Sequence, residues 1–486
     1  MTELLDRLTA DCLAALGPSR VITDHAQLRT YECDGLSSYR CIPGLVVLAE
    51  STADIAFVVR RCAELGIPFV ARGSGTGLSG GALPRSDGVL IVTTRLNHIL
   101  SVDPDDGRAV VEPGVINAHL TREAMVHGFY YAPDPSSQQV CSLGGNVAEN
   151  SGGAHCLKYG FTAHHVTGLE MVMPDGTTEQ FGGLAPDPVG YDVVGAVVGS
   201  EGTLGVVTQA TVRLLRTPAA VQTALAAFRT VDDAGAAVSA IIAAGVLPAA
   251  VEMMDALAIE AAEAAVHPGY PAGAGAVLVI ELDGPPSEVD VQLTDVERFC
   301  TEAGAFEIRI AADEAERALI WKGRKSAFAA VGRISPDYIV QDGVIPRTAL
   351  PGVLRAIEEV AADAGIRVAN VFHAGDGNLH PLVLFDESRG ETERAEAVSN
   401  RIIDLCLEHG GSITGEHGVG HDKKLHMGKM FNEIDLDVMQ LLRCAFDPGG
   451  ICNPGKVFPT PRLCGERPGR ARGLHPLQEA GVADVF

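Results

Sequence analysis

The sequence predicts an α+β protein with two main domains, and three observations lead to this expectation. Residues 71–81 (ARGSGTGLSGG) lie between two strand-like apolar runs, with no helical pattern after them. Two more glycine-rich segments follow before residue 207, each beside strand-like sequence. Beyond Pro218, strand-like and helical patterns alternate, which is typical of split β-α-β units with helices on one face of an antiparallel sheet.

Length and composition limit the possible functions. The chain has 486 residues, enough for about two or three domains, and a net charge of -25, which argues against binding nucleic acid. No apolar run reaches the roughly 20 residues that span a bilayer. The first residues lack the basic flank and apolar stretch of a signal peptide, so a cytoplasmic location is expected.

The cysteines do not form a metal motif. Eleven cysteines are scattered from Cys12 to Cys464, and no two have C-x-x-C spacing. This excludes a zinc ribbon or an iron-sulfur cluster of the usual spacing. We expect most of them to be buried thiols in a reducing compartment.

The N-terminal part begins with helical patterns. Residues 1–40 form a helical segment, because leucines and alanines recur at helical spacing over residues 3–16. Residues 45–49 read as a strand. Ser51 or Thr52 then caps a helix that ends at Gly66.

The first glycine-rich segment has the composition of a phosphate-binding loop. Its glycines allow sharp turns that bring backbone N-H groups close to a diphosphate. Gly75, Gly77 and Gly80 match the dinucleotide fingerprint, which requires a helix directly afterwards. Pro84 and the turn at residues 86–88 prevent that helix, so a Rossmann site is not expected. The alternative is a mobile surface loop.

Two further segments share this character. Residues 133–153 are dense in proline, serine, glycine and asparagine, a composition that suits a flat polar ring lying close to the backbone. Residues 199–207 (GSEGTLGVV) form a glycine-rich turn that enters a strand, after a predicted hairpin at residues 166–181. Two ordinary turns are the alternative for residues 133–153. Three such segments indicate one common ligand.

Together these segments resemble the FAD-binding (PCMH-type) domain of the vanillyl-alcohol oxidase class of flavoproteins. The resemblance implies an FAD domain at residues 41–217. No histidine lies within residues 71–81, where some members attach the flavin, so we expect dissociable, non-covalent FAD. The implied cofactor-binding residues are Arg72, Gly73, Ser74, Gly75, Thr76, Gly77, Pro133, Asp134, Ser136, Ser137, Gly144, Gly145, Asn146, Asn150, Gly153, Glu201, Gly202, Val206 and Asn453.

The second half carries candidate catalytic residues. His373 and His380 lie at the ends of two apolar strands joined by a short Ala-Gly-Asp-Gly-Asn loop, which brings both imidazoles to one rim. Glu416 and His417 add a carboxylate and a third imidazole in a loop without regular periodicity. Two histidines and a carboxylate can bind a divalent metal and leave positions open for substrate. The alternative is structural or solvated histidines.

These motifs, HAGDGNLH and GEHGVG, resemble those of the FAD-linked D-2-hydroxy-acid dehydrogenases. That family includes D-lactate dehydrogenases, D-2-hydroxyglutarate dehydrogenase and the flavoprotein D subunit of glycolate oxidase, which looks most similar. The resemblance implies that His373, His380 and Glu416 bind Zn, Mn or Fe and that His417 is the acid/base group. It also implies a ferredoxin-like cap domain at residues 218–445, a return to the FAD domain at residues 446–460 and a tail at residues 461–486.

The chemistry agrees with these roles. A cation on the substrate hydroxyl lowers its pKa, and an imidazole can take the proton as hydride leaves for the flavin. The substrate carboxylate needs a positive partner, for which we select Arg324, beside Lys325, because of its planar fork. A solvated basic helix face is the alternative. Phe328 and Val340 replace polar residues of dicarboxylate-oxidising relatives, which favours a small monocarboxylate.

The sequence therefore predicts an FAD-dependent dehydrogenase that oxidises a small 2-hydroxy acid, glycolate or D-lactate, to the 2-oxo acid. The resemblance implies a glycolate oxidase complex with a second flavin-domain subunit and an iron-sulfur subunit, through which the protein would associate with a membrane. The alternatives are a stand-alone D-lactate dehydrogenase and a flavin-binding subunit without turnover.

Overall fold

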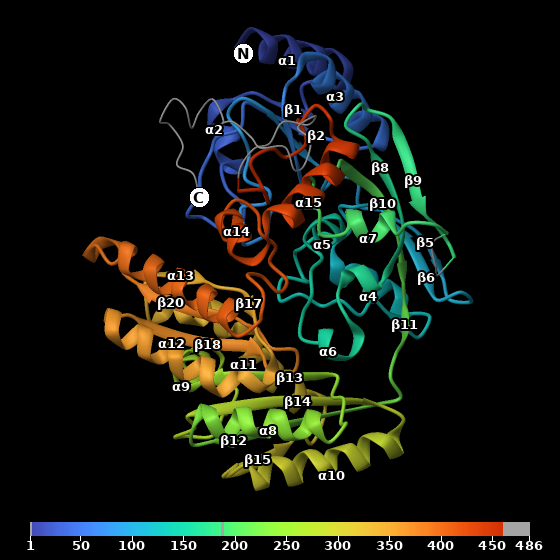
Figure 1. Cartoon of the computed structure of the whole chain (residues 1–486). Helices are drawn as coiled ribbons and strands as arrows, with labels where there is room; N and C mark the ends of the chain where they lie inside the picture. The colour runs from blue at the N-terminus through green and yellow to red at the C-terminus, as the bar shows by residue number, and fades with distance from the viewer. Residues whose placement is uncertain (1, 186–188, 460–486) are drawn as a thin grey trace.

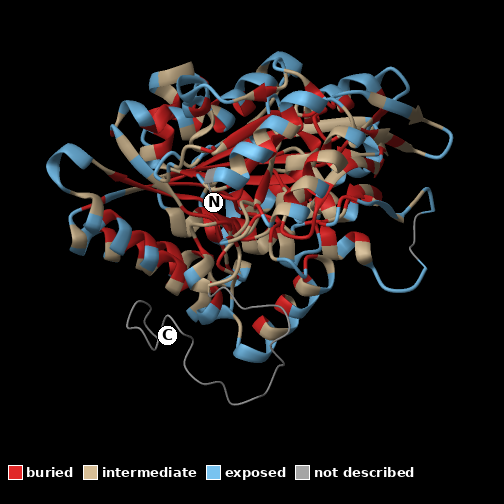
Figure 2. Ribbon diagram, turned by 90° about the horizontal axis from the view of Figure 1, so that it is seen from above, coloured by how far each residue is buried: buried red, intermediate tan, exposed pale blue. Residues whose placement is uncertain are grey.

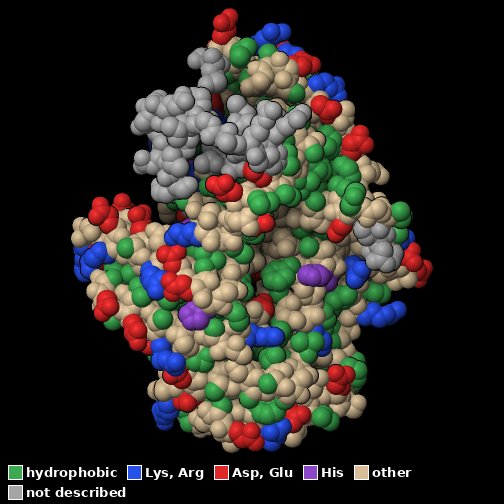
Figure 3. All heavy atoms as spheres, viewed as in Figure 1, with side chains coloured by type: hydrophobic (Ala, Val, Ile, Leu, Met, Phe, Trp, Pro, Cys, Tyr) green, Lys and Arg blue, Asp and Glu red, His purple; other side chains and the backbone are tan. Residues whose placement is uncertain are grey.

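A computed structural model describes residues 2–185 and 189–459 of the chain (Figure 1). The predicted tail at residues 461–486 lies outside the described residues. Buried residues fill the strands in the middle of the molecule, and exposed residues lie mainly on the outer helices and loops (Figure 2). Acidic and basic side chains are both scattered over the face seen in Figure 3.

A small mixed sheet begins the N-terminal domain, in the strand order β1-β2-β4-β3. Strands β2, β4 and β3 run parallel. The Ser51 side chain accepts a hydrogen bond from the backbone N-H of Asp54, and Gly66 ends the helix in the left-handed region at φ 64°, so both predicted helix signals are confirmed. The elements are α1 (Thr2–Leu16), β1 (Val21–Ile22), α2 (His25–Leu28), β2 (Leu45–Leu48), α3 (Thr52–Leu65), β3 (Phe69–Arg72) and β4 (Val89–Val92).

The first glycine-rich segment joins β3 to β4 without a helix, as predicted. Gly75 and Gly80 have φ values of 71° and 73°, in the left-handed region that only glycine adopts readily. The absence of a following helix separates this loop from the dinucleotide fold that its spacing imitates.

A second, antiparallel sheet completes the domain, in the order β5-β6-β10-β8-β9. The predicted hairpin at residues 166–181 is confirmed by β8 and β9. A short helix, α5, occupies part of the second glycine-rich segment, so the alternative of two ordinary turns does not describe that segment. The elements are β5 (Ile99–Asp103), β6 (Arg108–Val111), α4 (Asn117–Met125), β7 (Phe129–Tyr130), α5 (Leu143–Glu149), α6 (Cys156–Tyr159), β8 (Val166–Val172), β9 (Thr178–Gly182), α7 (Val193–Val197), β10 (Val206–Arg213) and β11 (Leu215–Arg216).

The cap domain is built on a larger sheet with the strand order β15-β12-β14-β13-β18-β19-β17, to which β16 and β20 are joined through β18. Its strands pair antiparallel. The elements are β12 (Ala220–Phe228), α8 (Val231–Ala243), β13 (Ala250–Asp255), α9 (Ala256–Val266), β14 (Ala276–Gly284), α10 (Pro286–Glu302), β15 (Glu307–Ile310), α11 (Glu314–Ala330), β16 (Asp337–Val340), β17 (Gly343–Val344), α12 (Leu350–Ala364), β18 (Arg367–His373), β19 (Asn378–Leu379), β20 (Pro381–Phe385) and α13 (Thr392–Glu408).

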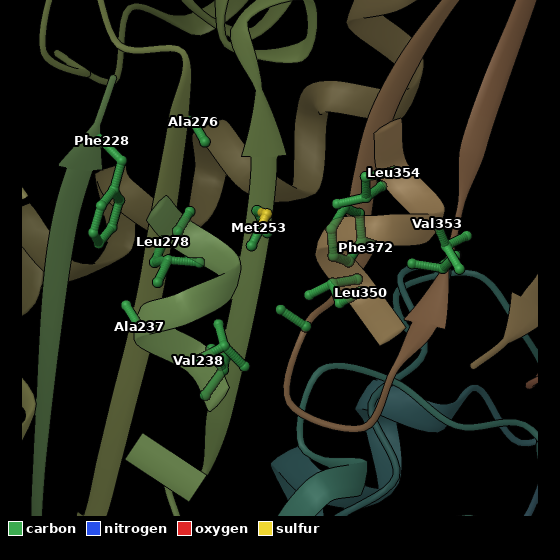
Figure 4. Close-up of a cluster of buried hydrophobic side chains, with 14 of the residues drawn as sticks. Phe228, Ala237, Val238, Met253, Ala276, Leu278, Leu350, Val353, Leu354 and Phe372 are labelled. Carbon is green, nitrogen blue, oxygen red and sulfur yellow. The ribbon is translucent and has the colours of Figure 1, made fainter. Parts of the chain in front are cut away.

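The prediction that helices cover only one face of this sheet is wrong. Helices α8, α10, α12 and α13 pack on one face, where Leu278 and Phe372 meet side chains such as Val238 and Leu354 (Figure 4). Helices α9 and α11 pack on the other face against Val277 and Val279. Because β14 has apolar residues at successive positions, both of its faces must be covered.

The chain crosses between the domains more than once. It leaves the N-terminal domain after β11 and, as Figure 1 shows, comes back to it with α15 (Glu433–Phe446), which follows α14 (Met427–Met430) and whose Phe446 packs against Phe181 of β9. The backbone N-H of Phe69 donates to the carbonyl of Ile451 at 2.9 Å, and the N-H of Asn453 donates to the carbonyl of Phe69 at 2.8 Å. The last described segment therefore pairs with the edge strand of the first sheet.

Within residues 2–185 and 189–459, none of the helices is both long and apolar enough to cross a membrane. Nine cysteines in the same ranges are free thiols, and seven of the nine are buried.

Candidate active site

A cavity of about 990 Å³ lies between the two domains. The N-terminal domain contributes the first glycine-rich loop, most of α5 and the turn at residues 200–207. The cap domain contributes part of α11, the β16 strand, His380, Glu416 and His417. The glycine segments and the histidine motifs, which are far apart in the sequence, therefore share one cavity.

Most of the predicted cofactor residues line this cavity. Close packing explains why residue 73 is a glycine, because a Cβ atom at this position would lie 2.1 Å from Ser142 Oγ. The backbone N-H of Ser74 donates to the same hydroxyl at 3.3 Å. The lining residues from the predicted set are Arg72, Gly73, Ser74, Gly75, Thr76, Gly77, Ser136, Ser137, Gly144, Gly145, Asn146, Glu201, Gly202 and Val206.

Five predicted cofactor residues are not part of the cavity lining: Pro133, Asp134, Asn150, Gly153 and Asn453. Three of them have side chains bonded within the protein. The Asp134 carboxylate pairs with His155 Nδ1 at 2.9 Å, Asn150 Oδ1 accepts from the N-H of Ala163 at 2.8 Å, and Asn453 Nδ2 donates to two backbone carbonyls.

Pro133 and Gly153 have backbone roles. The carbonyl of Pro133 accepts a hydrogen bond from Asn117 Nδ2 at 2.9 Å. Gly153 lies against the backbone of Asp134, where a Cβ atom would come within 2.5 Å. These residues shape the segment behind the cavity wall.

His373, His380 and Glu416 come together as predicted. His373 ends β18, His380 lies between β19 and β20, and Glu416 lies in a loop without helix or strand. The Nε2 atoms of His373 and His380 lie 3.2 Å and 3.1 Å from Glu416 Oε1. The candidate ligand atoms of the three residues lie within 4.8 Å of one another.

The donor atoms of this triad fit a metal ion. His373 Nδ1 is bonded to Glu252 Oε1 at 2.7 Å, so a neutral His373 presents the Nε2 lone pair to the site. Glu416 Oε2 is buried without a hydrogen-bond partner in the described part of the chain. A carboxylate oxygen and two imidazole nitrogens are suitable ligands for Zn, Mn or Fe.

The pKa values of the triad reflect the close pairing of its carboxylate and imidazole groups. Burial raises the pKa of Glu416, but hydrogen bonds from His373 and His380 outweigh it and hold this pKa well below its usual range. Burial lowers the pKa of His373, but the carboxylates of Glu252 and Glu416 outweigh it and raise this pKa well above its usual value. The pocket therefore favours a positive charge beside Glu416.

His417 lines the cavity and is suited to accept a proton. Its ring stacks on that of His380, with centroids 5.0 Å apart and planes inclined by 14°. Burial lowers the pKa of His417 to about 4. The imidazole is therefore neutral near pH 7.

Two functional carboxylates were missed by the sequence analysis. Glu252 on β13 orients His373. Asp342 accepts hydrogen bonds from the backbone N-H groups of Gly415 and His417, both at 2.9 Å, and so holds the loop that carries the triad's carboxylate. The signal for Glu252 was a single carboxylate in an apolar strand, which requires a buried partner. Asp342 resembles an ordinary Asp-Gly turn.

The two basic residues of α11 differ in environment. Arg324 was expected to face the substrate, but its side chain is 3% exposed and is paired with Glu252 at 2.5 Å. Lys325, Phe328 and Val340 line the cavity, whereas Arg324 is not part of the lining. The expectation for Arg324 is corrected because a buried carboxylate already occupies its guanidinium.

Family comparisons agree with this geometry. The model "FAD binding domain" matches residues 43–182, and "FAD linked oxidases, C-terminal domain" matches residues 217–457. The chain belongs to the FAD-linked oxidases. FAD is therefore its cofactor, as predicted, and the first two glycine-rich segments lie within the residues that match the FAD binding domain.

Curated relatives extend over most of this FAD-linked oxidase. Glycolate oxidase subunit GlcD of Escherichia coli (strain K12) is 51% identical over 437 residues, covering 90% of this chain and 88% of the relative. GlcD of Bacillus subtilis (strain 168) is 39% identical over 91% of this chain and 94% of the relative. D-lactate dehydrogenase of Anaerostipes hadrus is 31% identical over 91% and 95%.

Solved structures confirm the predicted PCMH-type fold. 4-Ethylphenol oxidase from Gulosibacter chungangensis has a TM-score of 0.78 at 20% identity, covering 95% of this chain and 98% of that one. p-Cresol methylhydroxylase has a TM-score of 0.80 at 17% identity, covering 94% and 97%.

Proposed function

We propose that this FAD-linked oxidase is a dehydrogenase that oxidises glycolate, and also D-lactate, to the 2-oxo acid. The observation that carries the proposal is the position of His417, a half-buried imidazole with a lowered pKa, in a cavity that the glycine-rich segments also line. The relatives named glycolate oxidase subunit and D-lactate dehydrogenase support the substrate class.

We assign the base role to His417. A neutral imidazole can take the hydroxyl proton of a 2-hydroxy acid, and bound FAD supplies the acceptor for the hydride. The backbone of His417 is fixed by Asp342, and its ring rests on His380. These two contacts hold the base at one side of the cavity.

We further propose that His373, His380 and Glu416 hold a divalent Zn, Mn or Fe ion. Such an ion would lower the pKa of the substrate hydroxyl. Glu252 supports this assignment because it keeps Nε2 of His373 directed into the triad. The excess of carboxylates around the triad favours a cation for the same reason that it raises the pKa of His373.

We assign Lys325 as the residue that binds the carboxylate of the substrate. Lys325 lines the cavity, and the buried Arg324 lies beside it in the sequence and retains Glu252 as its partner. Phe328 and Val340 supply apolar surface at the same wall. One positive side chain with apolar neighbours suits a small monocarboxylate better than a dicarboxylate such as 2-hydroxyglutarate.

We propose that the FAD is dissociable and that the protein works in the cytoplasm with a second flavin-domain subunit and an iron-sulfur subunit. The word "subunit" in the names of two relatives supports partners of some kind. Contact with a membrane would then be made through those partners.

The test is anaerobic mixing of the purified FAD-loaded protein with glycolate, D-lactate, L-lactate and D-2-hydroxyglutarate. We expect glycolate and D-lactate to bleach the flavin absorbance. A flavin that none of the four acids reduces would refute the proposal. Purification with an iron-sulfur partner distinguishes a complex from a stand-alone D-lactate dehydrogenase, and His417→Ala with retained FAD tests the alternative of a subunit without turnover.

A further inference from the structure

The loop that carries His417 is docked onto the N-terminal domain by consecutive backbone hydrogen bonds. The N-H groups of Val419 and Gly420 donate to Glu201 Oε1 and Oε2, each at 2.7 Å. The next two N-H groups, of His421 and Asp422, donate to the carbonyl of Ser79 at 2.9 Å and 3.0 Å. Four cap-domain N-H groups are thus bonded to acceptors in the FAD domain.

Glu201 is held rigidly for this contact. The residue is 5% exposed, and its φ of 52° lies in the left-handed region that non-glycine residues seldom adopt. Asn453 Nδ2 donates to the carbonyl of Glu201 at 2.7 Å and to the carbonyl of Gly81 at 2.8 Å. The Asn453 side chain thus links the backbone at Glu201 to the backbone at Gly81, and this link supports the unusual conformation of Glu201.

The loop approaches the carboxylates so closely that only glycine fits. A Cβ atom on Gly418 would lie 2.1 Å from Glu149 Oε2 and 2.9 Å from Glu201 Oε1. A Cβ atom on Gly420 would lie 2.1 Å from the carbonyl oxygen of Ser79. Both glycines have positive φ values, of 85° and 55°. The contact leaves no space for the loop to move closer.

Glu149 and Glu201 are two buried carboxyl groups that lie beside the loop in this contact. Burial and the nearby Glu201 carboxylate raise the pKa of Glu149 well above its usual value. Burial also raises the pKa of Glu201, to about 7, and the N-H groups of Val419 and Gly420 oppose this rise because they stabilise its carboxylate.

We propose that Glu201 is a positioning residue that sets the place of His417 relative to the FAD-binding wall. Glu201 itself lines the cavity in the turn that enters β10, and Gly420 lies three residues beyond His417. A shift of the loop would move the base with respect to the cofactor, and rates fall steeply when reacting groups are misplaced. The inference rests on the function proposed above.

The decisive variant is Glu201→Gln. Glutamine keeps one acceptor oxygen but turns a donor N-H toward one of the two loop N-H groups, so one hydrogen bond is replaced by a repulsive contact. The matched control is Glu170→Gln on β8, because Glu170 also accepts hydrogen bonds, from Thr52 and Thr208, but is not part of the cavity lining.

Two measurements read the result. In Glu201→Gln we expect hydrogen exchange of the Val419 and Gly420 amides to rise at least tenfold, with or without FAD. At saturating glycolate we expect the rate of flavin reduction to fall at least tenfold, with FAD content and the glycolate KM within twofold of wild type. Glu170→Gln should change none of these.

The other outcomes are also decisive. Unchanged amide protection with a reduction rate within twofold of wild type overturns the inference, and so does a rate loss that follows FAD loss. If Glu201→Gln does not fold, Gly420→Ala breaks the same contact from the cap side and must reproduce both effects. Glu201→Asp, which keeps the charge, should recover part of the rate. A wild-type flavin that glycolate does not reduce refutes the proposed function instead, while the exchange data still test the docking.

Discussion

His155 of the N-terminal domain and Glu281 of the cap domain meet across the domain boundary, with Nε2 and Oε1 3.2 Å apart. The other ring nitrogen of His155 pairs with Asp134 at 2.9 Å. Trp321 stacks on the imidazole, with ring centroids 5.9 Å apart, and donates its indole N-H to Glu281 at 2.6 Å. A charged imidazole is thus held between two carboxylates and an aromatic ring.

This arrangement predicts a loss of stability at alkaline pH. Burial lowers the pKa of His155, but Asp134 and Glu281 outweigh it and raise this pKa to about 10. Because the unfolded value is about 6.5, the stabilisation is complete below pH ~6.5 and is lost as pH rises toward 10. Melting temperatures of wild type and His155→Gln should therefore converge over that range. Parallel curves would contradict the prediction.

Removing the Glu252 carboxylate should weaken both the fold and the metal site. Glu252→Gln leaves Arg324 buried without its counter-ion, which costs about 3–5 kcal/mol, and it disturbs the hydrogen bond that orients His373, which lowers metal affinity by about 10–100-fold. Urea unfolding and metal titration measure the two effects. Glu112→Gln, which removes a pair with the exposed His98, is the control and should cost under about 1 kcal/mol.

Metal removal should abolish turnover while FAD stays bound. Dialysis against a chelator is expected to leave the flavin spectrum unchanged, because none of the three triad residues belongs to the glycine-rich segments that line the cavity. Adding back Zn, Mn or Fe should restore glycolate oxidation in wild type but not in His380→Ala. Full activity after the metal content has been shown to be zero would rule out the metal proposal.

Lys325→Met should raise the KM for glycolate by about tenfold, equivalent to ~1.4 kcal/mol of carboxylate binding. Lys322→Met is the matched control, because Lys322 is an exposed lysine on the same helix that is not part of the cavity lining. Steady-state kinetics of the two variants decide the point. Equal KM values for glycolate in the Lys325→Met and Lys322→Met variants would show that Lys325 does not bind the substrate carboxylate.

Acid precipitation should release the flavin. The loop at residues 71–81 has no histidine to which FAD could be attached. The supernatant is expected to contain all of the FAD, measured by fluorescence. Yellow colour that stays with the precipitate would indicate a covalent bond.

The local sequence pattern was sufficient to predict that the first glycine-rich loop has no helix after it and that His373 and His380 lie close together. Proline and turn residues after Gly81 exclude a helix, and strand periodicity places His373 and His380 at one rim. Their rings lie 5.1 Å apart. Such features depend on neighbours close in the sequence, which is why they could be predicted.

Contacts between residues that are far apart in the sequence could not be predicted from the local sequence pattern. Arg324 looked available for substrate because its partner Glu252 lies on another strand. Helices on both faces of the cap sheet follow from the apolar run in β14, but that run does not say which helices supply the second face. Asp342 was overlooked because its four-residue neighbourhood describes a turn and its bonds reach residues 414–417.

The pairing of Ile451 and Asn453 with Phe69 has a consequence for biosynthesis. Strand β3 stays an open edge while the ribosome makes the whole cap domain, since the segment that pairs with it is translated afterwards. Open strand edges promote aggregation of nascent chains. The FAD domain is therefore completed only when nearly all of the polypeptide has emerged, and a fragment that stops at the end of β11 lacks the segment that pairs with its edge strand β3.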